Sequence, residues 1–265
     1  MEPVQHDSQA NSNRVWFITG ASSGLGRALA EAVLDRGERA VVTARKPERL
    51  LEFIERYPAQ ALVMELDVTR PDQAHDVVGH TMERFGRIDV LVNSAGYRVL
   101  GAIAELDLCQ VRRQFETNLF GLLTVTRTVL PIMRRARSGR IVNVSSVGGV
   151  REVAGFSADH ASTFAVEGFS EALAQEVEPL GITVTIVERL RVSSLDGQHK
   201  GDAARGADDI IQAIDAARPP LRLALGADAP NATRQTLAAV DDKLSAGLPQ
   251  RYGATERGMG DARAG

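Results

Sequence analysis

TGASSGLG, Thr19 to Gly26, is the stretch that decides the fold of this 265-residue chain. It follows the apolar run RVWFIT and precedes the helical pattern LGRALAEAVLDRG. Gly20, Gly24 and Gly26 permit a tight turn, close approach of a diphosphate, and close packing of a helix on a strand. The free amides at the helix N-terminus would then face the anion. This order predicts a dinucleotide-binding site, and a purely structural turn is the alternative.

Further apolar runs follow this segment, with helical patterns between them. The predicted strands are RVWFIT, RAVVTA, ALVMEL, IDVLVN, RIVNVSS, ITVTIVE and LRLALG. Continuous apolar strands separated by helices are typical of a parallel sheet covered on both faces. Right-handed crossovers then favour an α/β fold with a Rossmann-type doubly wound parallel sheet of about seven strands. No change of composition divides residues 14–250, which we expect to form one domain between flexible segments at 1–13 and 251–265.

Composition excludes several classes of protein. A net charge of −3 argues against a dedicated nucleic-acid surface, and the single cysteine excludes an internal disulfide and suits a reducing compartment. The histidines have no spacing typical of a metal site. The polar N-terminal segment has no apolar signal core, and no run approaches the roughly 18 apolar residues of a membrane span. We therefore expect a cytoplasmic protein that binds a small-molecule substrate, with no metal, nucleic-acid or membrane partner.

The second predicted strand ends in Thr43, Ala44 and Arg45. A dinucleotide site of this fold usually places an acid here to hold the ribose diol. Ala44 has no carboxylate, whereas the Arg45 guanidinium suits a 2′-phosphate, so the sequence favours NADP over NAD. An ordinary surface arginine is the alternative. Asp67 closes the third strand, where it would meet the adenine edge or cap the helix that begins near Pro71.

Four motifs together resemble the short-chain dehydrogenase/reductase family. They are TGxxxGxG at Thr19–Gly26, NSAG at Asn93–Gly96, Asn118 in TNLFG, and Ser146 in IVNVSSVGG. They occur in order and at suitable distances, and the resemblance extends from about Arg14 to Leu244. It implies NADP(H) as cofactor and a set of binding residues from the loops after the strands: Gly20, Ser22, Ser23, Gly24, Leu25, Gly26, Arg45, Asp67, Val68, Asn93, Ala95, Gly96, Thr163 and Ser194.

The resemblance also implies a reaction scheme that this chain departs from. In the family a Tyr gives the carbonyl oxygen a proton, a Lys four residues later holds the nicotinamide ribose, a Ser polarises the carbonyl, and an Asn supports a water. The segment SADHASTFAVEG is similar to the family's SAYHASKFALEG, which puts Asp159 at the Tyr position and Thr163 at the Lys position. Asp159, Ser146 and Asn118 are therefore the predicted catalytic residues.

Two further departures lie beyond the sixth strand. The family's Pro-Gly pair is replaced by Arg189 and Leu190, which would add bulk and a cation near the nicotinamide, while Ser194 keeps a hydroxyl at the next binding position. Relatives also insert a helical substrate lid that here is shortened, near residues 195–206. We expect a pocket that is open or covered by another segment. If water reaches Asp159, its carboxyl group, with an unperturbed pKa of about 4, donates no proton at neutral pH. Strong burial would instead raise that pKa and restore an acid.

Three functions agree with these departures. The first is an atypical NADPH-dependent oxidoreductase that acts on an activated, iminium-like acceptor, with natural-product biosynthesis as a possible setting. The second is a non-redox cyclase or isomerase that uses Asp159, and the third is an inactive pseudoenzyme with a binding or regulatory role. Drift after loss of selection would also explain the changes. The family's long central helices, here residues 107–136 and 157–178, predict a homodimer or homotetramer.

Overall fold

The computed structural model describes residues 13–146, 154–189, 200–226 and 238. Its strands are β1 (Val15–Ile18), β2 (Arg39–Ala44), β3 (Ala61–Glu65), β4 (Val90–Asn93), β5 (Gly139–Ser146), β6 (Ile182–Arg189) and β7 (Arg222–Leu225). Its α-helices are α1 (Gly24–Asp35), α2 (Leu51–Arg56), α3 (Pro71–Phe85), α4 (Leu108–Phe115), α5 (Leu122–Ala136), α6 (Ser157–Val177) and α7 (Lys200–Asp215). Short helical turns precede α2 at Pro47–Leu50 and follow α6 at Glu178–Leu180.

The seven strands form one parallel sheet in the order β3-β2-β1-β4-β5-β6-β7. The predicted Rossmann-type doubly wound sheet is therefore confirmed. The strand order reverses between β1 and β4, so the loops after these two strands diverge at the carboxyl edge of the sheet. Ligands of open α/β sheets bind in the crevice that such a reversal creates.

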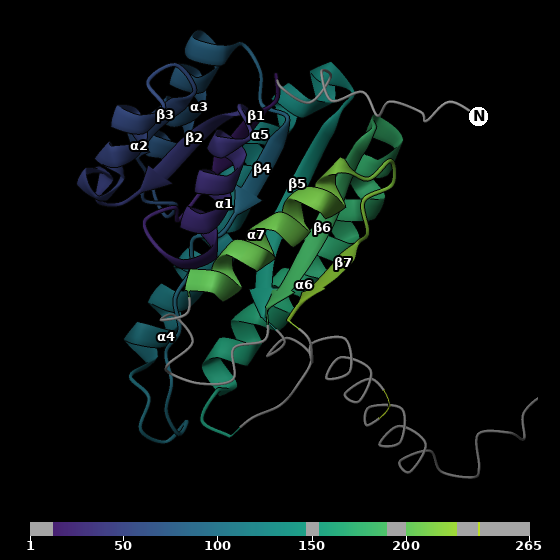
Figure 1. The fold of residues 1–265 in the computed structure, drawn as a ribbon. Coiled ribbons are helices and arrows are strands. Elements are labelled where there is room, and N and C mark those ends of the chain that lie inside the picture. Colours follow the sequence, from purple (N-terminus) through teal and green to yellow (C-terminus); the bar gives the residue numbers. More distant parts are fainter. Residues whose placement is uncertain (1–12, 147–153, 190–199, 227–237, 239–265) are drawn as a thin grey trace, which may run out of the picture.

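Side-chain alternation along β1 explains why its whole sequence is apolar. Trp16 and Ile18 belong to a core shared with α1, α2 and α7, whereas Val15 and Phe17 belong to a second core shared with α3, α5 and α6. All four side chains are fully buried. Figure 1 shows α1 and α7 side by side on one face of the sheet. Two covered faces require strands that are apolar at every position.

The predicted helix over 107–136 is interrupted. It consists of α4, a π-helix at Glu116–Gly121, and α5. A π-helical turn widens the helix locally and is frequent at functional sites. The described part of the chain contains no helix long and apolar enough to cross a membrane. Within the same residues, no group of three or more His, Cys, Asp or Glu side chains is placed to hold a metal.

Candidate functional site

A cleft at the carboxyl edge of the sheet brings together most of the predicted cofactor residues. Its walls come from the loops after β1, β2, β3 and β4, which converge because parallel strands end at the same edge. Predicted residues that line it are Gly20, Ser22, Ser23, Gly24, Leu25, Arg45, Asp67, Val68, Ala95 and Gly96. Further lining residues, not predicted, are Arg49, Ser94, Tyr97 and Thr117.

The glycine loop is packed so closely that side chains are excluded. Gly20 has a φ of +67°, and a β-carbon there would lie 2.7 Å from the Ala95 Cα. A β-carbon on Gly26 would lie 2.8 Å from the Gly20 carbonyl oxygen. Ser23 precedes α1, but its side chain makes no capping hydrogen bond. The first amides of α1 therefore have no side-chain cap, and the loop backbone forms a cradle suited to a diphosphate.

Two arginines line the end of the cleft next to β2. Arg45 follows β2 directly, and Arg49 lies four residues further on. Among the residues that the structure describes, neither guanidinium has a carboxylate partner. Asp67 lines the same end, and its Oδ1 accepts hydrogen bonds from the Thr69 amide at 3.0 Å and the Thr69 hydroxyl at 2.8 Å. Asp67 thus stabilises the turn before α3 while facing the cleft.

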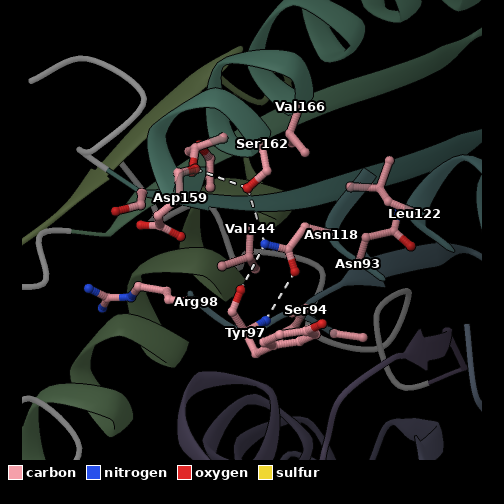
Figure 2. Close-up of a pocket in the computed structure, with 15 residues that line it drawn as sticks. Asn93, Ser94, Tyr97, Arg98, Asn118, Leu122, Val144, Asp159, Ser162 and Val166 are labelled. Carbon is pink, nitrogen blue, oxygen red and sulfur yellow. Dashed lines mark hydrogen bonds between the residues drawn. The ribbon is translucent and has the colours of Figure 1, made fainter. Parts of the chain in front are cut away.

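A second cavity adjoins this cleft and holds the predicted catalytic residues. Asn118, Ser146, Asp159 and Thr163 all line it (Figure 2). The two spaces share the wall formed by 94–97 and Val144. A dinucleotide held by the glycine loop could therefore reach the second cavity with its far end.

Asp159 is buried, whereas the shortened lid suggested that water could reach it. Asp159 is only 4 % exposed, because the first turn of α6 packs against α4. The side chain of Gln114, fully buried on α4, lies beside it and donates to the Ser162 hydroxyl at 3.0 Å. The Gln114 amide is also 3.5 Å from the Asp159 Oδ1, at the outer limit of a hydrogen bond. The side chain of Asp159 is therefore largely removed from bulk solvent.

The Thr163 hydroxyl serves its own helix. Its Oγ1 donates to the Asp159 carbonyl oxygen at 2.7 Å, one turn earlier in α6. Because a hydroxyl has one proton, Thr163 retains only acceptor capacity toward a ligand. Its short side chain lines the second cavity but not the cleft of the glycine loop.

Two asparagines have separate structural tasks. Asn118, in the π-helix, donates to the Tyr97 carbonyl oxygen at 2.9 Å and accepts from the Tyr97 amide at 3.0 Å. Asn93 is buried at the end of β4, where its amide donates to Thr126 at 3.0 Å and to Asn143 at 2.9 Å. Asn93 therefore ties β4 to β5 and α5 at the floor of the second cavity.

An ionic cluster lies directly behind this cavity. The Ser145 hydroxyl, at the cavity wall, donates to a buried Glu167 carboxylate at 2.5 Å. Burial raises the pKa of the Glu167 carboxyl, although the Ser145 hydrogen bond and the nearby Arg222 charge oppose this. Arg222 also binds Glu171 at 2.7 Å and the buried Glu188. Burial lowers the pKa of Arg222, but these carboxylates outweigh it and raise the pKa above its usual value.

The sequence as a whole agrees with this geometry. Residues 14–194 match the family model described as short chain dehydrogenase. The chain belongs to the short-chain dehydrogenase family. It is 36 % identical to oxidoreductase BOA17 of Botryotinia fuckeliana, over 87 % of this chain and 96 % of that protein.

Solved structures of the family have the same fold as this chain. A short-chain dehydrogenase from Streptomyces avermitilis is 39 % identical, with a TM-score of 0.81 over 88 % of this chain and 95 % of that one. A metagenomic short-chain oxidoreductase in complex with NADP is 26 % identical, with a TM-score of 0.72 over 82 % of this chain and 97 % of that one.

The Arg189 side chain, at the end of β6, extends to the glycine loop. A β-carbon built on Gly24 would lie 4.0 Å from the Arg189 Nη1, so the guanidinium reaches the start of α1. Side-chain alternation explains this direction, since Val187, two residues earlier, belongs to the core under α1 and α7. The guanidinium therefore lies beside the glycine loop, and its place relative to a bound nicotinamide stays a prediction.

Parts of the prediction fall outside the described residues. They are Leu190, Ser194 and positions 195–199 of the predicted lid. Positions 200–206 of that segment form the first turns of α7, where Gly206 lies against Leu25 of α1. This part of the predicted lid belongs to a helix that packs on the sheet.

Several residues of the second cavity escaped the sequence analysis, among them Tyr97, Arg98 and Ser162. Tyr97 and Arg98 directly follow the NSAG motif, so reading that motif two residues further would have included them. Ser162 lies three residues after Asp159 and therefore on the same face of α6. Gln114, which contacts this face, lies four residues before Asn118, and only its burial beside Asp159 shows its importance.

Proposed function

We propose that this family member is an NADPH-dependent reductase whose acceptor carbon is already activated, as in an iminium ion. One observation carries the proposal: Asp159, Ser146 and Asn118 line one cavity, and this cavity shares lining residues with the cleft of the glycine loop. A carboxylate at this place stabilises positive charge on an acceptor. The family resemblance puts Asp159 where other members have the proton-donating Tyr.

The cofactor preference is supported by charge at the end of the cleft next to β2. Arg45 and Arg49 offer guanidinium groups to a 2′-phosphate, and Ala44 has no carboxylate for a ribose diol. At the loop of Gly20 and Gly24, the backbone cradle and the nearby Arg189 suit the diphosphate. We propose that Arg189 compensates in part for Thr163, which has no charge to hold the nicotinamide ribose.

The proposed chemistry requires no proton donor. NADPH, when bound, supplies a hydride. Asp159 would orient and stabilise the cationic acceptor, and its burial strengthens this interaction because water does not screen it. Ser146 would fix the acceptor from the facing end of β5. Reduction of an unactivated ketone needs an acid at this position, and losing general acid catalysis typically costs about 10²–10⁴ in rate.

The test compares two acceptors in one assay of NADPH consumption. A preformed cyclic iminium compound, N-methyl-3,4-dihydroisoquinolinium, should be reduced, whereas a ketone of the same size, 1-tetralone, should not. Asp159→Asn keeps the shape of the side chain and should slow the iminium reaction about tenfold or more, because its charge is gone. Asp76→Asn, on the exposed surface of α3, is the control for loss of one negative charge.

Three results would contradict this proposal. Brisk reduction of the ketone would mean that a proton donor survives. Turnover that is equally fast with NADP+ would favour the non-redox cyclase or isomerase, because hydride transfer would then not be needed. Absence of any turnover together with unimpaired NADPH binding would favour the pseudoenzyme.

A further inference from the structure

We propose that Arg98 forms a carboxylate-binding subsite in the second cavity, so that the acceptor is a cationic imine that also carries a carboxylate. This inference rests on the proposed reductase function for its cationic half. Arg98 lines the cavity together with Asp159 and Ser146. Figure 2 shows the Arg98 guanidinium and the Asp159 side chain at the same end of that cavity.

The backbone around Arg98 is fixed on both sides. Tyr97, before it, is bound at its amide and at its carbonyl by Asn118. Val99, after it, donates its amide to the Gln114 Oε1 at 2.8 Å and is buried. The start of the Arg98 side chain therefore has a defined position. A charged group on a fixed backbone is suited to binding a ligand group in one orientation.

The same two carboxamides also hold the helix that carries Asp159. Gln114 donates to the Ser162 hydroxyl at 3.0 Å, and Asn118 lies within 3.3 Å of that hydroxyl. Arg98 and Asp159 are thus placed relative to one another through shared partners. Two opposite charges that line one cavity are the arrangement expected for a zwitterionic ligand, whose two charged groups need different partners.

Among the residues that the structure describes, Arg98 has no carboxylate partner. Its residue is half-buried, and the described ranges provide it with no hydrogen bond or ion pair. Removing a guanidinium from water without an anionic partner is unfavourable, so a ligand carboxylate would be stabilised there. The planar guanidinium binds a carboxylate through two parallel hydrogen bonds. No other arginine or lysine lines this cavity in the described residues, which favours a carboxylate over a more highly charged phosphate.

The reaction balances without a further reactant. A hydride from the reduced nicotinamide forms a C–H bond at the iminium carbon, and the C=N π pair becomes the lone pair of nitrogen. The products are an amino acid with a neutral amine and the oxidised nicotinamide. The carboxylate on Arg98 and the iminium nitrogen beside Asp159 take no part in bond making with the protein. They set which carbon faces the cofactor.

Binding of an unreactive planar analogue tests the subsite without turnover. Pyrrole-2-carboxylate resembles a cyclic imino acid, and pyrrole-2-carboxamide is its neutral counterpart. Calorimetry on the protein saturated with NADPH should show binding of the carboxylate and at least tenfold weaker binding of the amide, since an ionic hydrogen bond is lost. Arg98→Met should remove this preference, and Arg98→Lys should retain part of it. Arg112→Met, an exposed arginine on α4, should leave the preference unchanged.

The outcomes separate this inference from the proposed function. If Arg98→Met binds the carboxylate as well as the unmodified protein does, or if the protein binds neither compound, the proposal of a carboxylate subsite at Arg98 is wrong. Tighter binding of phenyl phosphate than of benzoate would overturn the assignment to carboxylates. Arg98-dependent carboxylate binding in a protein that reduces no iminium compound would uphold the subsite and reject the reductase. Circular dichroism of each variant would exclude loss of folding.

Discussion

Asn118 binds both the amide nitrogen and the carbonyl oxygen of Tyr97 through a single carboxamide. The contact joins the π-helix between α4 and α5 to the loop after β4, which forms the common wall of the cleft and the second cavity. Close packing accompanies it, because a β-carbon on Gly96 would lie 3.1 Å from the Asn118 Oδ1. The shared wall of the two proposed ligand sites therefore depends on this one side chain.

Asn118→Asp should disturb that wall with almost no change of volume. A carboxylate still accepts from the Tyr97 amide, but it cannot donate to the Tyr97 carbonyl oxygen and repels it. We expect a loss of about 1–3 kcal/mol in the free energy of unfolding. NADPH should also bind more weakly, because the loop over 94–97 lines the cleft. Urea denaturation and fluorescence titration with NADPH measure the two effects.

The matched control for this change is Thr124→Ala. Thr124 lies on the next turns of α5, and its exposed hydroxyl donates only to the Phe120 carbonyl oxygen of its own helix. Both measurements should stay close to those of the unmodified protein. If Asn118→Asp behaved like this control, the contact with Tyr97 would contribute nothing measurable to the free energy of unfolding or to NADPH affinity.

The sequence predicts the sheet well because its signals there are local. β1 is apolar at every position and β4 is apolar up to Asn93, its last residue, and the turn after β1 contains the glycines that its close packing requires. The extent of each cavity depends instead on contacts between distant segments. Asp159 is buried because α4, more than 40 residues earlier, covers it through Gln114. No local pattern contains that contact.

The direction of a long side chain is also difficult to predict from a motif. Arg189 occupies the place of a proline in the family pattern, which suggested that it would lie near the nicotinamide. Its guanidinium extends toward Gly24, because β6 alternates and its core-facing residue Val187 points toward α1. Knowledge of the sheet order would have been enough to infer this, since it determines which helix covers β6.

Arg45 should determine the choice between the two nicotinamide cofactors. Arg45 lines the end of the cleft next to β2, where we propose that the 2′-phosphate binds. Arg45→Ala should weaken NADPH binding about tenfold or more while leaving NADH binding within about twofold. Titration of both cofactors, monitored by nicotinamide fluorescence, provides the comparison. An equal loss of affinity for NADPH and NADH would mean that Arg45 supports the fold of the cleft and does not bind the 2′-phosphate.

Arg189 should contribute to cofactor affinity through the diphosphate. We expect Arg189→Ala to weaken binding of NADPH and NADH alike, by about tenfold or more, because the lost contact is common to both. Affinity should also fall less steeply with added salt than in the unmodified protein. Arg127→Ala, an exposed arginine on α5, controls for the change of net charge. Tighter binding after Arg189→Ala would show that the guanidinium obstructs the cleft, in agreement with a pseudoenzyme.

The pH dependence of stability should report on Glu167, behind the second cavity. Burial raises the pKa of this carboxyl in the folded protein, so the folded state binds its proton more tightly than the unfolded chain does. Its contribution to stability is therefore fully present below the unfolded pKa and is lost as pH rises through the raised folded value. Glu167→Gln cannot ionise, so its stability relative to the unmodified protein should improve as pH rises from about 4.5, the ordinary value for this group. The improvement should reach about 1.4 kcal/mol for each unit of pKa difference.

Urea denaturation at a series of pH values measures this difference, and Glu171→Gln is the matched control. Glu171 lies one turn further along α6 and binds the same Arg222, but its side chain is 49 % exposed. The stability of Glu171→Gln relative to the unmodified protein should therefore change little over this pH range, because water already solvates that carboxylate. If Glu167→Gln instead lost relative stability as pH rose, its ion pair with Arg222 would outweigh burial, and the carboxyl group would be more acidic in the folded protein than in the unfolded chain.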